Sequence, residues 1–172
     1  DLPGQSGHIH LSLTNNDGTS AFYDANKQYN MSDIQRHFLA GQQHLMPEFL
    51  SMIAPTVNSF SRMVPGVWAP LDATWGVENR TTALRVIPGS AKSQRVEYRL
   101  AAADANPYIA LAAALASGLY GIEHQLEPTP QVKGNAYEQE HPKELTLPAT
   151  LFEAAGVLKQ SQAAKAMFGE EF

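Results

Sequence analysis

The chain of 172 residues is 44% hydrophobic, which is enough for one well-packed core and about one domain. Its formal net charge of −5 leaves no broad basic face, so we do not expect it to bind nucleic acid. Because the chain contains no Cys, a disulfide framework, a thiolate metal site and a Cys nucleophile are excluded, which suits a cytoplasmic protein.

A first strand is predicted over residues 7–13 by alternating polar and apolar side chains. His8, His10 and Ser12 share one face of this strand, and its other face is apolar. Two imidazoles at this spacing can approach one ligand, although paired strand histidines are also common as ordinary surface residues. The polar stretch 15–18 predicts the turn of a hairpin that ends near Tyr23.

A helix is predicted to begin after Ser32, which has the spacing to form a capping box with Gln35. Pro47 is predicted to separate it from a second helix that ends near residue 53, because proline favours the first turn of a helix. His37 and His44, seven residues apart on the first helix, could share a ligand. No carboxylate joins them at the spacing of a metal site, so packing or solvent exposure is favoured for both.

The segment 58–70 is dense in Pro and Gly and contains a single Arg, Arg62. Such a segment is typical of a loop, and loops held on a rigid scaffold often carry binding residues. We therefore treat it as a candidate binding loop.

Positive charge is concentrated between residues 80 and 99. This stretch holds five of the chain's 12 Lys and Arg residues, which are Arg80, Arg85, Lys92, Arg95 and Arg99. Two strands are predicted here, over residues 82–87 and 95–100, with a turn at 88–90. Together they are expected to present several Arg side chains on one side of a sheet.

In the second of these strands, Arg95, Glu97 and Arg99 share one face, and the opposite face is apolar. The planar fork of arginine suits phosphate and carboxylate, and a carboxylate among cations can hold a divalent metal that bridges phosphate oxygens. The alternative is a solvated sheet face on which Arg and Glu pair across strands. Spacing alone leaves both interpretations open.

A long helix is predicted over residues 107–122, with Asn106 as its N-cap and Pro107 as its first residue. It is rich in Ala and Leu all round, so it is expected to be buried across the back of the Arg-bearing sheet. No apolar run reaches the roughly 20 residues of a membrane-spanning helix. Thr150 with Glu153 predicts a further capping box, and Ser161 predicts the start of a last helix.

Several separated motifs resemble the catalytic domain of the glutamine synthetase family. They are N-R-T-T-A-L-R-V at 79–86, K-S-Q-R-V-E-Y-R at 92–99 and D-A-N-P-Y-I-A-L-A-A-A-L-A-S-G-L at 104–119, while G-Q-S-G-H-I-H-L-S-L at 4–13 resembles the ATP-binding signature of that family. The resemblance implies an α+β fold with a curved antiparallel sheet of the glutamine synthetase and guanido kinase type, backed by helices. Residues 1–172 match the later part of the catalytic domain. We therefore expect the N-terminal β-domain and the first part of the catalytic domain to be absent, and this piece alone to be inactive.

The resemblance further implies an ATP-dependent ligase that forms a γ-glutamyl amide through γ-glutamyl phosphate, with ATP as co-substrate and Mg²⁺ or Mn²⁺ as the metal. The metal ligands would be His8 and Glu97. The nucleotide would be bound by His10, Ser12, Arg80, Arg85 and Lys92. Glutamate would be bound by Gly4, Arg62, Arg80 and Arg99, with Arg80 and Arg62 as catalytic residues. No role is assigned to Arg95.

Trp68 departs from the family pattern, because glutamine-forming members carry a Glu two residues after Pro-Gly that helps to bind ammonium. An indole supplies no negative charge, although its face can hold a cation or pack on an alkyl chain. The departure favours a larger amine over ammonia as the acceptor, as in the γ-glutamylpolyamine-type relatives. The alternatives are that Glu78 takes the missing role or that the protein has lost activity.

Two other functional classes stay open: a non-catalytic structural relative, such as the lens protein of this superfamily, and a phosphagen-kinase-like phosphotransferase. Retention of His8, Glu97 and the Arg residues favours the ligase over the first, whereas Trp68 favours the non-catalytic relative. The H-I-H strand at 8–10 and the N-P-Y helix start favour the ligase over the second. The resemblance also implies small-molecule partners, no membrane association and stacked-ring homo-oligomers of the full-length protein. Tyr137 matches a Tyr that some bacterial members modify, but we interpret it as a packing anchor.

Overall fold

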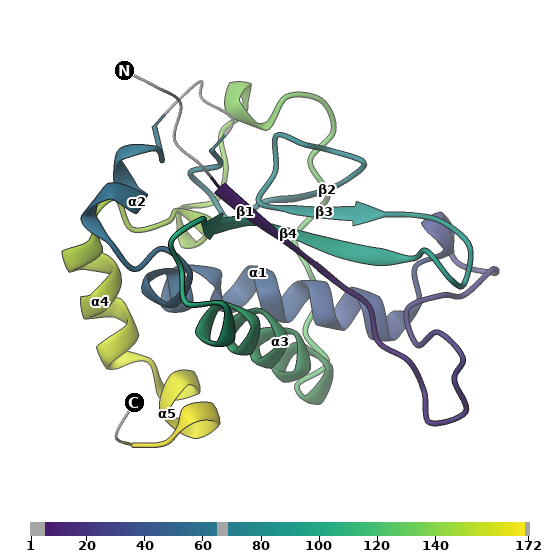
Figure 1. Cartoon of the computed structure of the whole chain (residues 1–172). Helices are drawn as coiled ribbons and strands as arrows, with labels where there is room; N and C mark the ends of the chain where they lie inside the picture. Colours follow the sequence, from purple (N-terminus) through teal and green to yellow (C-terminus); the bar gives the residue numbers. More distant parts are fainter. Residues whose placement is uncertain (1–5, 65–68, 171–172) are drawn as a thin grey trace.

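The computed structural model describes residues 6–64 and 69–170 and consists of a four-stranded sheet with helices packed on its apolar side (Figure 1). The strands lie in the order β1 (Ser6–Leu11), β4 (Arg95–Ala102), β3 (Leu84–Ile87) and β2 (Trp75–Val77). β4 pairs antiparallel with both β1 and β3, whereas β2 pairs parallel with β3. The predicted α+β class with a helix-backed sheet is confirmed, and the short parallel edge strand is an addition to the prediction.

Strand β4 divides the molecule into an apolar side and a polar side. Val96, Tyr98 and Leu100 are at most 2% exposed and belong to the main core. The polar side chains of Glu97 and Arg99 bond to one another on the opposite face. The predicted alternation of this strand is therefore confirmed.

Helix α1 (Asp33–Ile53) begins as predicted, because the side chain of Ser32 accepts a hydrogen bond from the backbone N–H of Gln35. The second half of the capping box is not formed, since the buried Gln35 side chain instead accepts a hydrogen bond from Gln94. The prediction that Pro47 separates two helices is wrong, because Pro47 lies inside one continuous helix. Phe49 and Leu50 beyond it are as fully buried as Leu45 before it. The free energy gained by burying these side chains therefore outweighs the cost of the backbone hydrogen bond that proline removes.

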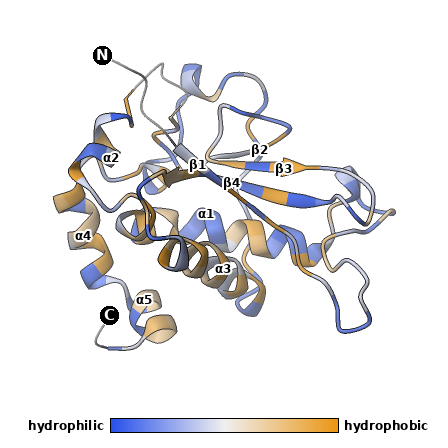
Figure 2. Cartoon of the chain, in the orientation of Figure 1, coloured by the Kyte–Doolittle hydropathy of each residue, from blue (hydrophilic) through white to orange (hydrophobic). Residues whose placement is uncertain are grey.

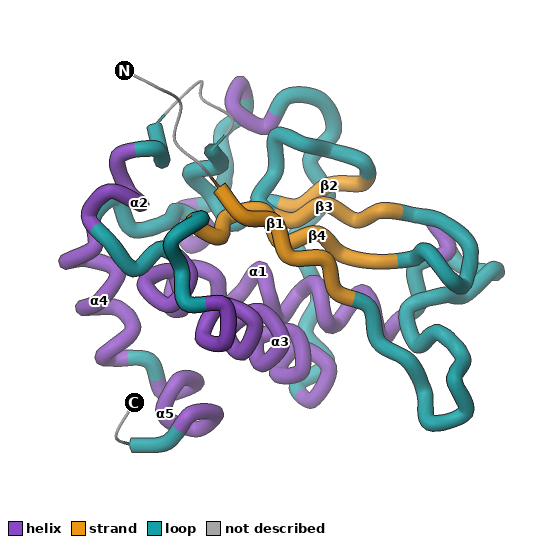
Figure 3. The backbone as a smooth tube through the Cα atoms, in the orientation of Figure 1, coloured by secondary structure: helices purple, strands orange, loops and turns teal. Residues whose placement is uncertain are grey.

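Helix α3 (Pro107–Glu123) also begins as predicted, with the Asn106 side chain accepting hydrogen bonds from two backbone N–H groups of the first turn. It packs on α1 and reaches the sheet at β1, so both helices lie on one side of the strands (Figure 3). The prediction that α3 is buried all round is wrong. Its buried stripe consists of small residues such as Ala113 and Gly118, while Leu111 and Leu119 are 48% and 46% exposed on its outer, apolar face (Figure 2).

The remaining elements surround this core. They are α2 (Val57–Ser61), α4 (Leu151–Gln160), α5 (Gln162–Phe168) and the 3₁₀ turns η1 (Gln28–Asn30), η2 (Ala136–Glu138) and η3 (Lys143–Leu145). Thr150 and Ser161 cap α4 and α5 as predicted. The second half of the predicted Thr150 capping box is not formed, because the Glu153 side chain accepts from the backbone N–H of Ala149. None of the helices in the described ranges has the length and hydropathy that crossing a membrane requires.

Candidate active site

A buried carboxylate, that of Glu97, lies at the centre of the polar side of the sheet. Its side chain is 4% exposed and is surrounded by side chains from three strands. Oε1 lies 2.9 Å from Nη1 of Arg99 and 2.9 Å from Nδ1 of His8, and Oε2 accepts a hydrogen bond of 3.1 Å from Nη1 of Arg85. Nε2 of His10 lies further away, at 3.8 Å from Oε1. We call these five residues the Glu97 cluster.

Strand register explains how the cluster forms. Glu97 lies directly opposite His10 on β1 and directly opposite Arg85 on β3. An irregularity in the β1–β4 pairing leaves His8 facing both Arg99 and Leu100, so the side chain of His8 also reaches the carboxylate. His10 and Glu97, which are 87 positions apart in the chain, are thereby brought together. The alternating patterns placed each of them on a polar strand face, and only the family resemblance implied a shared site.

The charges of the cluster favour an ionised carboxylate beside a neutral imidazole. Burial alone would raise the pKa of Glu97, but Arg99 and Arg85 outweigh this effect and hold the pKa below its ordinary value. Burial, followed by the nearby charge of Arg99, lowers the pKa of His8. A neutral imidazole nitrogen and a carboxylate oxygen are both donors that a divalent cation accepts.

His8 and Glu97 therefore fit a divalent metal, but they supply only part of its coordination sphere. In residues 6–64 and 69–170, no group of three or more His, Asp or Glu side chains is close enough to hold a metal ion. Further ligands would have to come from substrate, from water or from another part of the full-length protein.

Arg85 links the cluster to a second carboxylate. Its Nε and Nη2 both donate to Oε2 of Glu78, while its Nη1 donates to Glu97. Burial would lower the pKa of Arg85, but its bonds to Glu78 and Glu97 outweigh that effect and raise it. The sequence did not indicate this role for Glu78, because the residue follows a three-residue strand with no periodic pattern.

Arg62 contacts strand β4 next to Arg99. Nη2 of Arg62 donates a hydrogen bond of 2.8 Å to the backbone carbonyl of Leu100, the residue after Arg99. The Nε atoms of both arginines, and the hydroxyl of Tyr137, are buried without a hydrogen-bond partner among the described residues. Buried N–H donors normally have partners, so the unpaired Nε–H groups make Arg62 and Arg99 candidates for contact with an anionic ligand. Burial also lowers the pKa of Arg62, partly offset by Asp104.

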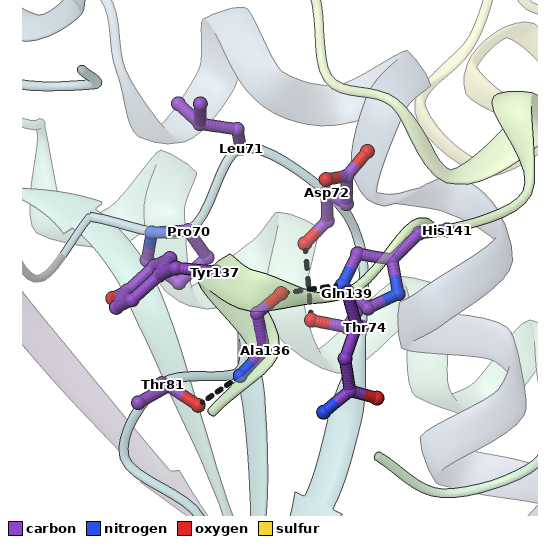
Figure 4. Close-up of a pocket in the computed structure, with 9 residues that line it drawn as sticks. All are labelled: Pro70, Leu71, Asp72, Thr74, Thr81, Ala136, Tyr137, Gln139 and His141. Carbon is purple, nitrogen blue, oxygen red and sulfur yellow. Dashed lines mark hydrogen bonds between the residues drawn. The ribbon is translucent and has the colours of Figure 1, made fainter. Parts of the chain in front are cut away.

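Tyr137 belongs to a small pocket beside this site (Figure 4). Its ring lies next to Pro70, and the backbone of the neighbouring Ala136 is fixed by two hydrogen bonds: its N–H donates to Oγ1 of Thr81, and its carbonyl accepts from Nε2 of His141 (Figure 4). Burial raises the pKa of Tyr137, whereas the charge of Arg99 acts in the opposite direction. The sequence analysis interpreted Tyr137 as a packing anchor and did not include it among the site residues.

The other predicted site residues lie outside the Glu97 cluster. Three of them are exposed: Arg80, Lys92 and Ser12. Neither of the two cations forms an ion pair within the described ranges. Arg80 lines an open groove with Lys133, at the end of β2. Arg95, to which no role was assigned, donates a hydrogen bond of 3.2 Å to Nδ1 of His10 and so orients that imidazole.

Two predicted residues, Gly4 and Trp68, lie outside the described residues. The expectations that Gly4 contacts glutamate and that Trp68 alters the amine pocket therefore stay predictions.

Comparison with known proteins places this geometry in context. The profile of the family "Glutamine synthetase, catalytic domain" matches residues 1–172. The chain is 46% identical to a type-1 glutamine synthetase of Dictyostelium discoideum, over 100% of this chain and 33% of that protein. It is also 46% identical to a γ-glutamylethanolamide synthetase of Streptomyces coelicolor, over 99% of this chain and 36% of that protein.

Among solved structures, apo GmaS without ligand superposes on this chain with a TM-score of 0.83 at 32% sequence identity. The match covers 96% of this chain and 38% of that structure. The chain thus spans about a third of the length of the curated relatives that it matches.

Proposed function

The chain belongs to the glutamine synthetase catalytic-domain family, and we propose that the full-length protein is an ATP-dependent ligase that joins the γ-carboxylate of glutamate to an amine. The observation that supports this proposal best is the Glu97 cluster, a buried carboxylate between a neutral imidazole and two guanidinium groups. Members of the family use ATP and a divalent metal ion, and we propose Mg²⁺ or Mn²⁺ for this protein.

The proposed reaction has two steps. A γ-carboxylate oxygen of glutamate attacks the terminal phosphorus of ATP, and the bond to ADP breaks to give γ-glutamyl phosphate. The amine nitrogen then attacks the γ-carbonyl carbon, phosphate leaves and the nitrogen loses a proton. Phosphoryl transfer of this kind depends mainly on positioning and on neutralising negative charge.

Each group of side chains has a part in this proposal. Arg62 and Arg99, whose buried Nε atoms have no hydrogen-bond partner among the described residues, would hold glutamate, and Arg80, Arg85 and Lys92 would hold phosphate groups. His10 and Ser12 would lie against the nucleotide. His8 and Glu97 would bind the metal ion, which when present neutralises phosphate oxygens.

We propose that the acceptor is an amine larger than ammonia. The relatives do not decide between the two, because one of the two at 46% identity is named a glutamine synthetase and the other a γ-glutamylethanolamide synthetase. Support comes from Trp68, since an indole cannot supply the negative charge that favours ammonium.

Phosphate release by the full-length protein with ATP, Mg²⁺ and glutamate would test the proposal. Ammonia, ethanolamine and a set of alkylamines and diamines would be added singly, and the γ-glutamyl amide would be identified by mass spectrometry. We expect phosphate release only when glutamate and an amine are both present. Preference for ammonia would contradict the larger amine, and release in no combination would favour the non-catalytic relative. ATP-dependent phosphorylation of a guanidine would favour the phosphagen-kinase-like alternative.

We further propose that the full-length protein works in the cytoplasm as a homo-oligomer of stacked rings with sites between subunits. Light scattering coupled to size-exclusion chromatography measures this directly. A monomeric full-length protein that is active would contradict the proposal.

A further inference from the structure

Glu78 has an unusual backbone conformation for its residue type. It follows β2 directly and has a φ of +51°, in the left-handed region that non-glycine residues seldom adopt. Its backbone N–H nevertheless donates a hydrogen bond of 2.9 Å to the carbonyl of Val86, which extends the pairing of β2 with β3. Backbone strain of this kind persists only where the surroundings hold it, and functional sites are enriched in it.

The side chain of Glu78 contacts Arg85, an arginine that also donates a hydrogen bond to the buried carboxylate of the Glu97 cluster. Oε2 of Glu78 accepts from Nε of Arg85 at 3.0 Å and also from Nη2. The Glu78 side chain is 50% exposed, that of Arg85 is 16% exposed and that of Glu97 is 4% exposed. Arg85 is therefore held between an outer carboxylate and a buried one.

A count of the N–H groups of Arg85 shows what this arrangement leaves available. A guanidinium has five N–H donors, and three are used in the bonds to Glu78 and Glu97. One N–H on each terminal nitrogen is left over. These two can donate to a phosphate while Arg85 keeps its present position.

Loss of the Glu78 carboxylate would change the contacts of Arg85. The Nε and Nη2 edge of a guanidinium matches the two oxygens of a carboxylate, so Arg85 would be free to turn this edge towards Glu97. Oε2 of Glu97 already accepts one hydrogen bond from Arg85 and Oε1 already accepts one from Arg99, so a two-point contact with Arg85 would occupy a further lone pair of the carboxylate. Fewer lone pairs of Glu97 would be available to a metal ion.

We propose that Glu78 is a positioning residue that restrains Arg85 to a single hydrogen bond with Glu97, so that Oε2 of Glu97 keeps a lone pair for the divalent metal and Arg85 keeps two N–H donors for phosphate. This inference rests on the proposed function. Glu78 acts here through Arg85 and touches neither metal nor substrate.

Equilibrium binding of Mn²⁺ and of ADP to the full-length protein tests the proposal without turnover. Free Mn²⁺ is measured by electron paramagnetic resonance and ADP binding by calorimetry. We expect Glu78→Gln to weaken Mn²⁺ binding by about 10-fold or more, the range found when outer partners of metal ligands are removed. Glu127→Gln is the matched control, because Glu127 also binds an arginine, Arg36, and its side chain is 59% exposed. That variant should bind Mn²⁺ like the wild type.

A double variant separates positioning from a general structural effect. If Glu78 acts through Arg85, the change Glu78→Gln has no further effect on Mn²⁺ binding when Arg85→Ala is already present. Equal effects in the two backgrounds would overturn the proposal. A melting temperature close to that of the wild type shows that Glu78→Gln has not unfolded the site.

The remaining outcomes are also decisive. Mn²⁺ binding by Glu78→Gln equal to that of the wild type overturns the role of Glu78 but leaves the proposed ligase intact. Unchanged Mn²⁺ binding with tighter ADP binding overturns it as well, because Glu78 would then be a competitor of phosphate for Arg85. A wild-type protein that binds neither Mn²⁺ nor ADP overturns both this inference and the proposed function.

Discussion

Arg80 is the cation whose removal most directly tests the proposed transfer step. Its side chain is exposed and unpaired within the described ranges, so it can turn towards a bound phosphate. In the full-length protein we expect Arg80→Ala to lower kcat by about 30- to 1000-fold, equivalent to about 2–4 kcal/mol of transition-state stabilisation. Steady-state phosphate release at saturating ATP, glutamate and amine measures this effect.

The control for Arg80→Ala is Lys133→Ala, which removes another exposed cation from the same groove. Because no part in the reaction is assigned to Lys133, its loss should change kcat by less than about twofold, the size of an ordinary surface effect. A loss below tenfold for Arg80→Ala would count against its assigned role. Similar losses in both variants would indicate a general effect of charge in the groove.

At the residue scale, the sequence predicted the parts of the site that depend on strand alternation. It placed Glu97 and Arg99 on one face of β4 and the two histidines on one face of β1, and all four belong to the Glu97 cluster. It could not predict the contact of Glu78 with Arg85, which depends on a parallel strand pair and on a left-handed backbone. Local propensity carries no signal for either feature.

The contact between α1 and α3 depends on an approach of the two backbones that only glycine permits. A Cβ atom on Gly121 would lie 2.1 Å from the carbonyl oxygen of His37 and 2.5 Å from the nitrogen of Gly41. We expect Gly121→Ala to destabilise the fold by about 1–3 kcal/mol, because the helices would have to separate. Thermal unfolding of the full-length protein should show a lower melting temperature.

Gly156 in α4 provides the matched control for Gly121, because a Cβ atom there would meet nothing within 4 Å. Alanine favours helix over glycine by about 0.5–1 kcal/mol, so Gly156→Ala should leave the melting temperature unchanged or raise it. A tolerated Gly121→Ala would show that the helices are not so closely packed.

The first turn of α1 carries a pH-dependent interaction. Asp33 contacts Arg36 at 2.9 Å and Lys27 at 3.2 Å, and these hydrogen bonds lower the pKa of its carboxyl from 3.8. A lowered pKa contributes stability above pH 3.8 that is lost as the pH falls through the lowered value. We therefore expect Asp33→Asn to melt slightly below the wild type at pH 7, with a difference that closes below pH 3.8.

Melting temperatures of both proteins between pH 7 and pH 3 measure this difference. Because the carboxylate is exposed, the effect is small and high salt should reduce it. A difference that persists unchanged at the lowest pH would show that charge is not its cause.

At the scale of elements, the sequence predicted where helices begin better than it predicted how far they continue and which of their faces are buried. Ser32, Asn106, Thr150 and Ser161 all cap helices as predicted, because capping depends on residues within one turn. The continuity of α1 through Pro47 and the exposed outer face of α3 depend on what packs against each helix. Neighbours distant in the chain decide both, so composition alone gave the wrong answer.

In the molecule as a whole, the candidate site is well supported by the fold, but its set of metal ligands is incomplete. Helix α1 packs against β4, and the antiparallel pairings of β4 with β1 and β3 determine which side chains meet in the Glu97 cluster. Yet the described residues hold only His8 and Glu97 in the positions expected of metal ligands. The two relatives at 46% identity are about three times as long as the chain.

We therefore predict that residues 1–172 alone do not form a γ-glutamyl amide from ATP, glutamate and an amine. A divalent cation prefers six or more oxygen and nitrogen donors, and two side chains hold it too weakly and too loosely to align a transferring phosphate. Mass spectrometry of reactions with the isolated chain checks this, with the full-length protein as positive control. Circular dichroism and thermal unfolding of the isolated chain establish whether it is folded. A folded chain that makes the amide above the level of its Glu97→Gln variant would show that the Glu97 cluster is sufficient for catalysis.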